Sequence, residues 1–157
     1  MRDMFKGFKF NKNLPLKSVF YAPYTLPTIN ASRDVVDWTV TDFDTDTFIT
    51  PPEGATHFKL ILAVGYVDNY EYVPAMKSYE PEDDLVNGRG ASTASNPIPL
   101  GGMVGSDTVL QVDLSSLGAI PASTSIFVGI GIVFYQDTNG ELYELAQGNT
   151  MIIPVTG

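Results

Sequence analysis

Apolar and polar residues alternate along several stretches of this chain, as they do in β-strands that bury one face. The most apolar stretch is residues 125–135, SIFVGIGIVFY, which is rich in β-branched and aromatic residues. The turn sequence QDTNG follows it directly, and its Asn-Gly pair is a strong hairpin signal. Residues 141–145, ELYEL, are the predicted return strand. We expect this hairpin at the centre of a β-sheet.

The same period of two recurs in residues 34–41, 55–67 and 108–114. In the first of these stretches, Val36, Trp38 and Val40 share one face, so the only tryptophan is expected in the core. Prolines interrupt residues 18–28, which predicts a sheet edge or a crossing segment because proline removes a ladder donor. These elements together predict a β-protein.

Glycines inside the predicted strands indicate a bulge or a close neighbour, because glycine has no side chain to fill the sheet surface. We expect one of these at Gly65. Beside Gly129 and Gly131 we expect close packing by Trp38 or by a tyrosine. Residues 78–105 are acidic at first and then rich in small residues and glycine, which predicts a long surface loop.

The predicted fold is therefore all-β: a single β-sandwich of about seven to nine strands, immunoglobulin-like or jelly-roll-like, with an extended N-terminal arm. The arm is expected to span residues 1–17, and the β-sandwich domain residues 18–157. A chain of 157 residues is long enough for one domain with its own core.

Charged residues are few and unevenly distributed. They make up 17% of the chain, which carries a net charge of −9. Residues 1–17 hold five basic residues and one acidic one, whereas residues 18–157 hold four basic and seventeen acidic ones. A short basic segment thus precedes a strongly acidic body. The acidic total argues against nucleic acid or an anionic membrane as a partner.

The basic segment also carries aromatic residues. Phe8 and Phe10 alternate with Lys9 as in a strand. One interpretation is a frayed end followed by an edge strand. The other is an assembly arm that pairs onto a neighbouring subunit, where aromatic burial and lysine–acid attraction would hold it. The residues of this predicted assembly arm are Phe5, Lys6, Phe8, Lys9, Phe10 and Lys12.

Two other clusters are candidate sites. Tyr70, Tyr72 and Tyr79, with Tyr66, could form a ligand surface for a glycan or a protein, although cross-strand packing is the commoner use of such residues. The carboxylates of Asp42, Asp44 and Asp46 could attract Ca²⁺. The twelve-residue calcium-loop pattern lacks its central glycine there, so a solvated acidic strand edge is favoured.

The sequence offers little for catalysis. It has no cysteine and a single histidine, His57, which we interpret as structural. No glycine-rich stretch has phosphate-loop spacing. We therefore expect no enzymatic activity, no cofactor and no metal. No run approaches the roughly 18 apolar residues of a membrane span. The first thirteen residues lack the apolar segment of a signal peptide. The compartment stays open, with an extracellular or cell-surface location favoured.

Three runs carry a family resemblance: GFKFNKNLPLKSVFYAPYT, PPEGATHFKLI and GIGIVFYQDTNGELYEL. In this order they resemble an uncharacterised group of bacterial proteins, common in the Bacteroidetes, with a C-terminal all-β domain and similar GFEFN, FAPYT and GATHFK segments. Members often have a longer basic N-terminal region, and the chain departs from them there. The resemblance implies the fold and no activity, so it assigns no functional residues.

Two functions of different classes follow from these observations. The first is a non-enzymatic structural protein, the subunit of a surface, filament or particle that assembles as a homo-oligomer or polymer through its arm. The alternative is a carbohydrate- or protein-binding β-sandwich module that uses the tyrosine cluster.

Overall fold

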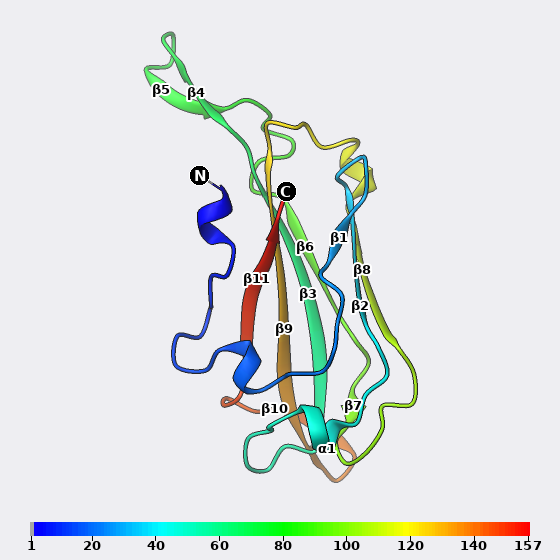
Figure 1. Ribbon diagram of the computed structural model, residues 1–157. Coiled ribbons are helices and arrows are strands. Elements are labelled where there is room, and N and C mark those ends of the chain that lie inside the picture. The colour runs from blue at the N-terminus through cyan, green and yellow to red at the C-terminus, as the bar shows by residue number, and fades with distance from the viewer. Residues whose placement is uncertain (1) are drawn as a thin grey trace.

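The computed structural model describes residues 2–157 and consists mainly of antiparallel strands (Figure 1). The strands are β1 (Thr28–Ile29), β2 (Val35–Val40), β3 (His57–Val67), β4 (Tyr70–Val73), β5 (Ser78–Pro81), β6 (Gly90–Ala94), β7 (Ile98–Pro99), β8 (Thr108–Asp113), β9 (Ser125–Thr138), β10 (Glu141–Glu144) and β11 (Thr150–Thr156). The helices are short: α1 (Thr45–Phe48) and three 3₁₀ turns, Arg2–Phe5, Leu16–Ser18 and Ser115–Leu117. The predicted all-β, sandwich-like fold is confirmed.

The larger sheet is built around β9 and β3, which pair along eleven consecutive residue positions. The other edge of β9 pairs first with β11 and then with β10, and the other edge of β3 pairs with β6 and β7. A second sheet has the order β1-β2-β8. The turn between β9 and β10 has positive φ at Asn139 (57°) and Gly140 (87°), so the hairpin expected from the Asn-Gly pair is confirmed.

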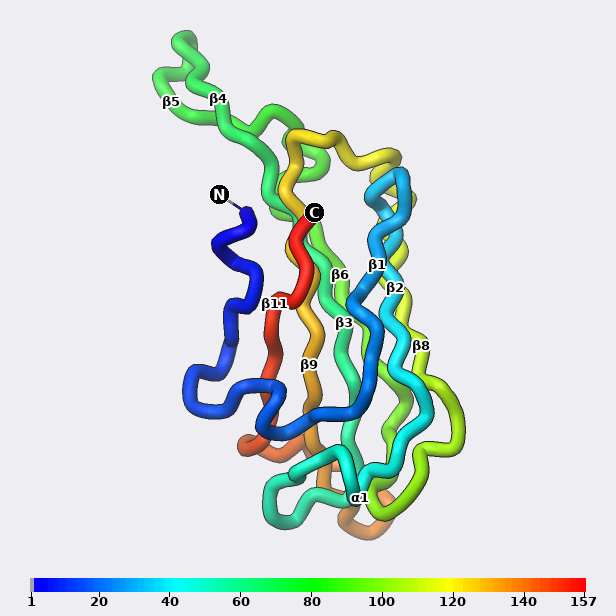
Figure 2. Tube along the Cα trace, viewed as in Figure 1, coloured from blue at the N-terminus to red at the C-terminus, as the bar shows by residue number. Residues whose placement is uncertain are grey.

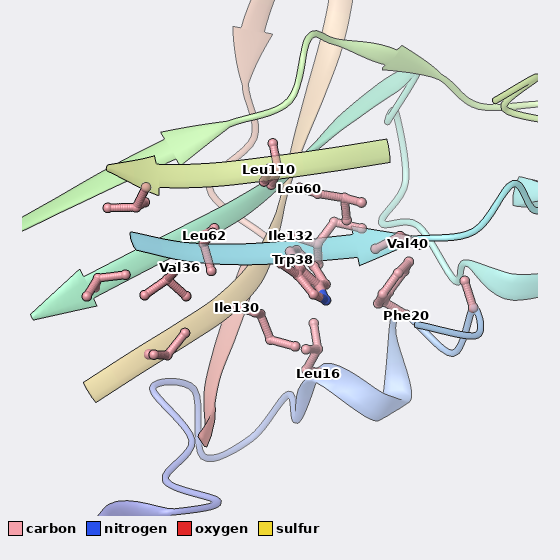
Figure 3. Packing of buried hydrophobic residues seen from close by; sticks show 14 of the residues in the cluster. Leu16, Phe20, Val36, Trp38, Val40, Leu60, Leu62, Leu110, Ile130 and Ile132 are labelled. Atoms are coloured by element: carbon pink, nitrogen blue, oxygen red, sulfur yellow. The ribbon is translucent and has the colours of Figure 1, made fainter. Parts of the chain in front are cut away.

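The core lies between these two sheets (Figure 3). Alternate residues of β3 and β9, from Phe58 to Tyr66 and from Ile126 to Phe134, are almost completely buried. Trp38 and its neighbours on β2 cover them, together with Leu16 and Phe20 from the crossing segment. Trp38 is therefore in the core, as predicted. Its Nε1 has no hydrogen-bond partner among residues 2–157, so packing alone holds the indole there.

Several expectations were wrong in detail. The region expected to be one long loop contains β5, β6 and β7, and its GASTA segment pairs with β3. The described chain has eleven strands rather than seven to nine, because several are only two to four residues long. Gly65 sits in regular pairing with no bulge, and a Cβ there would meet no described atom within 4 Å. The close neighbour of Gly129 and Gly131 is Met151, not Trp38 or a tyrosine.

The extended N-terminal arm is not what the structure contains. Of the predicted 1–17 segment, residue 1 lies outside the described residues; the rest runs beside β11 of its own chain (Figure 2). The amides of Gly7 and Phe10 donate to the carbonyl oxygens of Ile153 (2.7 Å) and Met151 (3.0 Å), and the amide of Ile153 donates to Phe8 (3.0 Å). The described part of the N-terminal arm thus docks along the edge of the larger sheet through an isolated bridge between Lys9 and Ile152, without forming a strand of its own.

Candidate functional site

The outer face of the larger sheet, opposite the core, is the most unusual surface of the molecule. Its central positions on β3 and β9 are small residues: Ala63, Gly65, Gly129 and Gly131. Met151 of β11 lies over the last two, with its sulfur 3.1 Å from where a Cβ of Gly129 would stand. The 3₁₀ turn Arg2–Phe5 and Met151 cover part of this face, and Gly129 and Gly131 are buried. Ile61, Ala63 and Gly65 of β3 remain half-buried and accessible to a partner.

Three rings of the N-terminal arm, Phe5, Phe8 and Phe10, lie along one side of this face, and we call them the aromatic wall. Phe8 and Phe10 meet edge to face with ring centroids 5.3 Å apart. Phe5 lies 6.5 Å from Phe8 and makes an edge-to-face contact with Phe127 of β9 at 5.3 Å. Backbone pairing with β11 fixes the arm, and the period of two places Phe8 and Phe10 on the same side. The three arm rings nevertheless remain 44–60% exposed.

Beside this wall runs a groove of about 770 Å³, which we call the aromatic groove. Its apolar lining comes from Phe5, Phe8, Phe10, Val67, Tyr70, Phe127 and Ile153. Arg2 and Asp68 are the charged residues of its lining. A second hollow of about 410 Å³ shares Phe10 and is lined also by Ile61, Val133 and Met151. Asn11, Lys12 and Asn149 also line the second hollow, so the two hollows adjoin at Phe10 and the second has a mixed polar and apolar lining.

At one end of the groove, strands β4 and β5 form a hairpin that projects beyond the body of the molecule (Figure 1). Tyr72 pairs with Tyr79 across the hairpin and Tyr70 with Pro81, so these side chains share one face. The rings of Tyr72 and Tyr79 are 5.4 Å apart with an interplanar angle of 61°. All three tyrosines are more than half exposed, whereas Tyr66 is buried with its hydroxyl donating to the Arg33 carbonyl.

The base of the hairpin is held firmly. Asp68, only 5% exposed, accepts hydrogen bonds from the Thr124 hydroxyl (2.9 Å) and the Asp83 amide (2.6 Å). Asn87 accepts from the Asp68 amide and donates to the Tyr70 hydroxyl. Because a buried carboxylate is costly without partners, these bonds fix where the hairpin leaves the sheet. The hairpin direction is thus a property of the fold.

Charge is divided between the two ends of this surface. Lys6, Lys9 and Lys12 of the arm are all exposed. Residues 68–84, which contain the hairpin, carry six acidic residues and only one basic residue. Burial lowers the pKa of Arg33. The positive charge of Arg2, which lines the groove, lowers that pKa further.

The other candidate residues have local roles. Asp44 caps α1 by accepting from the Asp46 amide (3.0 Å), and Asp42 accepts from the Gly105 amide (2.8 Å). Within residues 2–157, no group of three potential ligand side chains is placed to hold a metal ion. The His57 Nδ1 lies 2.9 Å from the Thr56 hydroxyl. These side chains form hydrogen bonds with nearby groups in loops and at strand ends.

Comparison of the chain with protein-family models, curated proteins and solved structures finds no match. None of the described helices has the length and apolar character required to cross a bilayer. Function is therefore inferred from the surface itself. Sequence reasoning singled out the arm aromatics and the tyrosines but missed the sheet face of small residues between them. The run of small residues at alternate strand positions was the signal that could have revealed it.

Proposed function

We propose that this protein is a non-enzymatic structural subunit that assembles with copies of itself through the aromatic groove. The observation that carries the proposal is the open row of arm rings beside an apolar sheet face. Monomeric soluble domains rarely leave a contiguous apolar surface of this kind uncovered, and such surfaces are commonly interfaces. Aromatic residues are also the ones that interface centres favour.

The composition of the groove favours assembly over catalysis. Of its two charged lining residues, Asp68 already accepts two hydrogen bonds within the fold. A general acid or base needs a titratable group that is free to meet a substrate, and this carboxylate is engaged in the hairpin base. Subunits of a surface, filament or particle need the opposite: a rigid apolar contact surface with a charged rim.

The test is light scattering coupled to size-exclusion chromatography. The full chain is expected to elute as species larger than a monomer at low salt and to shrink in high salt, because salt screens the attraction of exposed charges. Replacing Phe5, Phe8 and Phe10 together by serine should give a folded monomer. The aromatic contact surface is then lost, whereas the backbone pairing of the arm with β11 stays possible. Tyr143→Ser, at an exposed ring on β10, is the matched control and should assemble like the parent. A parent chain that is monomeric at every concentration would contradict the proposal.

A second candidate is a glycan- or protein-binding module, and the shared exposed face of Tyr70, Tyr72 and Tyr79 favours it. Sugar platforms present rings whose faces are open for stacking. The edge-to-face contact of Tyr72 with Tyr79 instead turns one ring against the other. The triple serine variant separates the two functions: glycan binding that survives in this monomer would favour the binding module.

A further inference from the structure

We infer that the segment occupying the aromatic groove is the β4–β5 hairpin of a second copy of this chain. The inference rests on the proposed assembly function and names the surface that meets the groove. It assigns the groove as acceptor and the projecting hairpin as donor.

The hairpin has the properties of a segment that needs a partner. A two-stranded hairpin is marginally stable by itself in water, and every residue of β4 and β5 is at least partly exposed. One of its faces carries Tyr70, Tyr72 and Tyr79, and Met76 at the tip is 69% exposed. An aromatic face of this kind matches the apolar lining and the aromatic wall of the groove in chemistry.

Charge provides the second argument. The segment that contains the hairpin carries six acidic residues and one basic residue, whereas the arm that walls the groove carries five basic and one acidic. Glu71 and Glu82 of the hairpin segment and Lys6 and Lys9 of the arm are exposed. Glu71 lies on the hairpin face opposite the tyrosines, and Lys9 alternates with Phe8 and Phe10, so these charges form a rim around the aromatic contact. A hairpin that enters a neighbour's groove brings its acidic rim toward that neighbour's basic arm. Opposite potentials of this kind steer encounter and fix the register of a contact.

The hairpin cannot serve its own groove in this way. Tyr70 at its base already lines the near end of the groove, and the hydrogen bonds of Asp68 and Asn87 direct the remainder away from the body (Figure 1). The distal residues, from Tyr72 to Tyr79, therefore reach another molecule. Since donor and acceptor are different surfaces, each contact leaves one free groove and one free hairpin. Such heterologous contacts propagate until a ring closes.

Two variants test the inference, each of which keeps only one of the two contact surfaces. The groove variant replaces Phe5, Phe8 and Phe10 by serine, and the hairpin variant replaces Tyr72, Met76 and Tyr79 by serine. Circular dichroism and thermal melting establish that both fold. Each alone is expected to be monomeric by light scattering. An equimolar mixture should form a one-to-one complex that does not grow with concentration, because only one donor and one acceptor remain.

Charge reversal gives an independent readout of the same contact. Lys6→Glu with Lys9→Glu, or Glu71→Lys with Glu82→Lys, should each weaken self-association about tenfold or more, since the arm and the hairpin segment then carry potentials of the same sign. Combining all four substitutions in one chain should restore association to near the parent level. Arg89→Glu, an exposed reversal outside the arm and hairpin strands, is the matched control and should leave association unchanged.

The outcomes separate the inference from the function on which it rests. If the hairpin variant assembles like the parent while the groove variant does not, assembly through the groove stands and the hairpin is not its occupant. If the two variants stay monomeric when mixed, the donor–acceptor pairing is wrong. If neither variant differs from the parent, both the inference and the proposed function fall.

Discussion

The two faces of the larger sheet use the same backbone for opposite purposes. On the inner face, β3 and β9 each contribute five large apolar side chains that are at most 5% exposed: Phe58, Leu60, Leu62, Val64, Tyr66, Ile126, Val128, Ile130, Ile132 and Phe134. On the outer face, the alternate positions include three glycines and an alanine. The inner face closes a core within the chain. The outer face leaves part of an apolar surface exposed, where we propose contact with another copy.

If the proposed association occurs, the difference implies that folding and association depend on different faces of the sheet. Burial of large side chains on the inner face supplies the hydrophobic stabilisation of the fold. The aromatic residues on the outer side are 44–60% exposed, so about half of their surface contributes nothing to the fold and would be buried only in the proposed contact. Substitutions on the inner face should therefore act on stability, and substitutions at the groove on association.

The largest effect is expected at the centre of the inner face. Ile130→Ala should lower the free energy of unfolding by about 2–5 kcal/mol, because it removes fully buried methyl groups and leaves a cavity. Ile61→Ala, a half-buried position on the outer face of β3, is the control, with an expected loss below about 1.5 kcal/mol. Urea denaturation at low protein concentration measures both. Equal losses for the two variants would contradict the division between the faces.

An intermediate effect is expected where β11 covers the outer face. A Cβ on Gly131 would stand 2.7 Å from the Thr150 carbonyl oxygen and 3.1 Å from the Met151 Cβ. Gly131→Ala should therefore destabilise the protein by about 1–3 kcal/mol through displacement of β11. Thermal melting of the variant measures the loss.

Gly65→Ala is the matched control for this prediction, at a strand glycine with no described atom within 4 Å of the new Cβ. It should be neutral or stabilise by up to about 1 kcal/mol, because alanine reduces the freedom of the unfolded chain. If Gly131→Ala melted at or above the parent temperature, β11 would not be packed tightly on these glycines.

The smallest effect on folding is expected in the aromatic wall. Phe10 is 60% exposed, so Phe10→Ala should change the free energy of unfolding by no more than about 0.5 kcal/mol. Phe58→Ala on the inner face, where the ring is fully buried, is the comparison and should cost about 3–5 kcal/mol. The measurement is the urea midpoint at a protein concentration where the chain is monomeric, since association adds apparent stability. A loss above 1.5 kcal/mol at Phe10 would make the wall part of the folding core.

Local sequence was sufficient for the central elements. The period of two in the β2 and β3 segments predicts both the strands and the face that each buries, because successive side chains of a strand point to opposite sides. The β9 strand follows from its continuous apolar, β-branched and aromatic run. The Asn139-Gly140 turn follows from the low cost of positive φ at these residues. The shared face of Tyr70 and Tyr72 follows from the same alternation. About half of the candidate surface, its aromatic residues, could thus be named from the sequence.

The tertiary structure alone decided where these pieces meet. Strand β6 is small and polar, with no alternation of its own, and exists because it pairs with β3. Lys9 pairs with Ile152 in an isolated antiparallel bridge, and Asp68 accepts a hydrogen bond from Thr124, fifty-six residues away. Local sequence determines what each segment favours, since propensity and periodicity act over a few residues. Pairing between remote segments depends on the shape and the unsatisfied hydrogen bonds of the whole chain, so the arm, the groove and the direction of the hairpin emerge only when it folds.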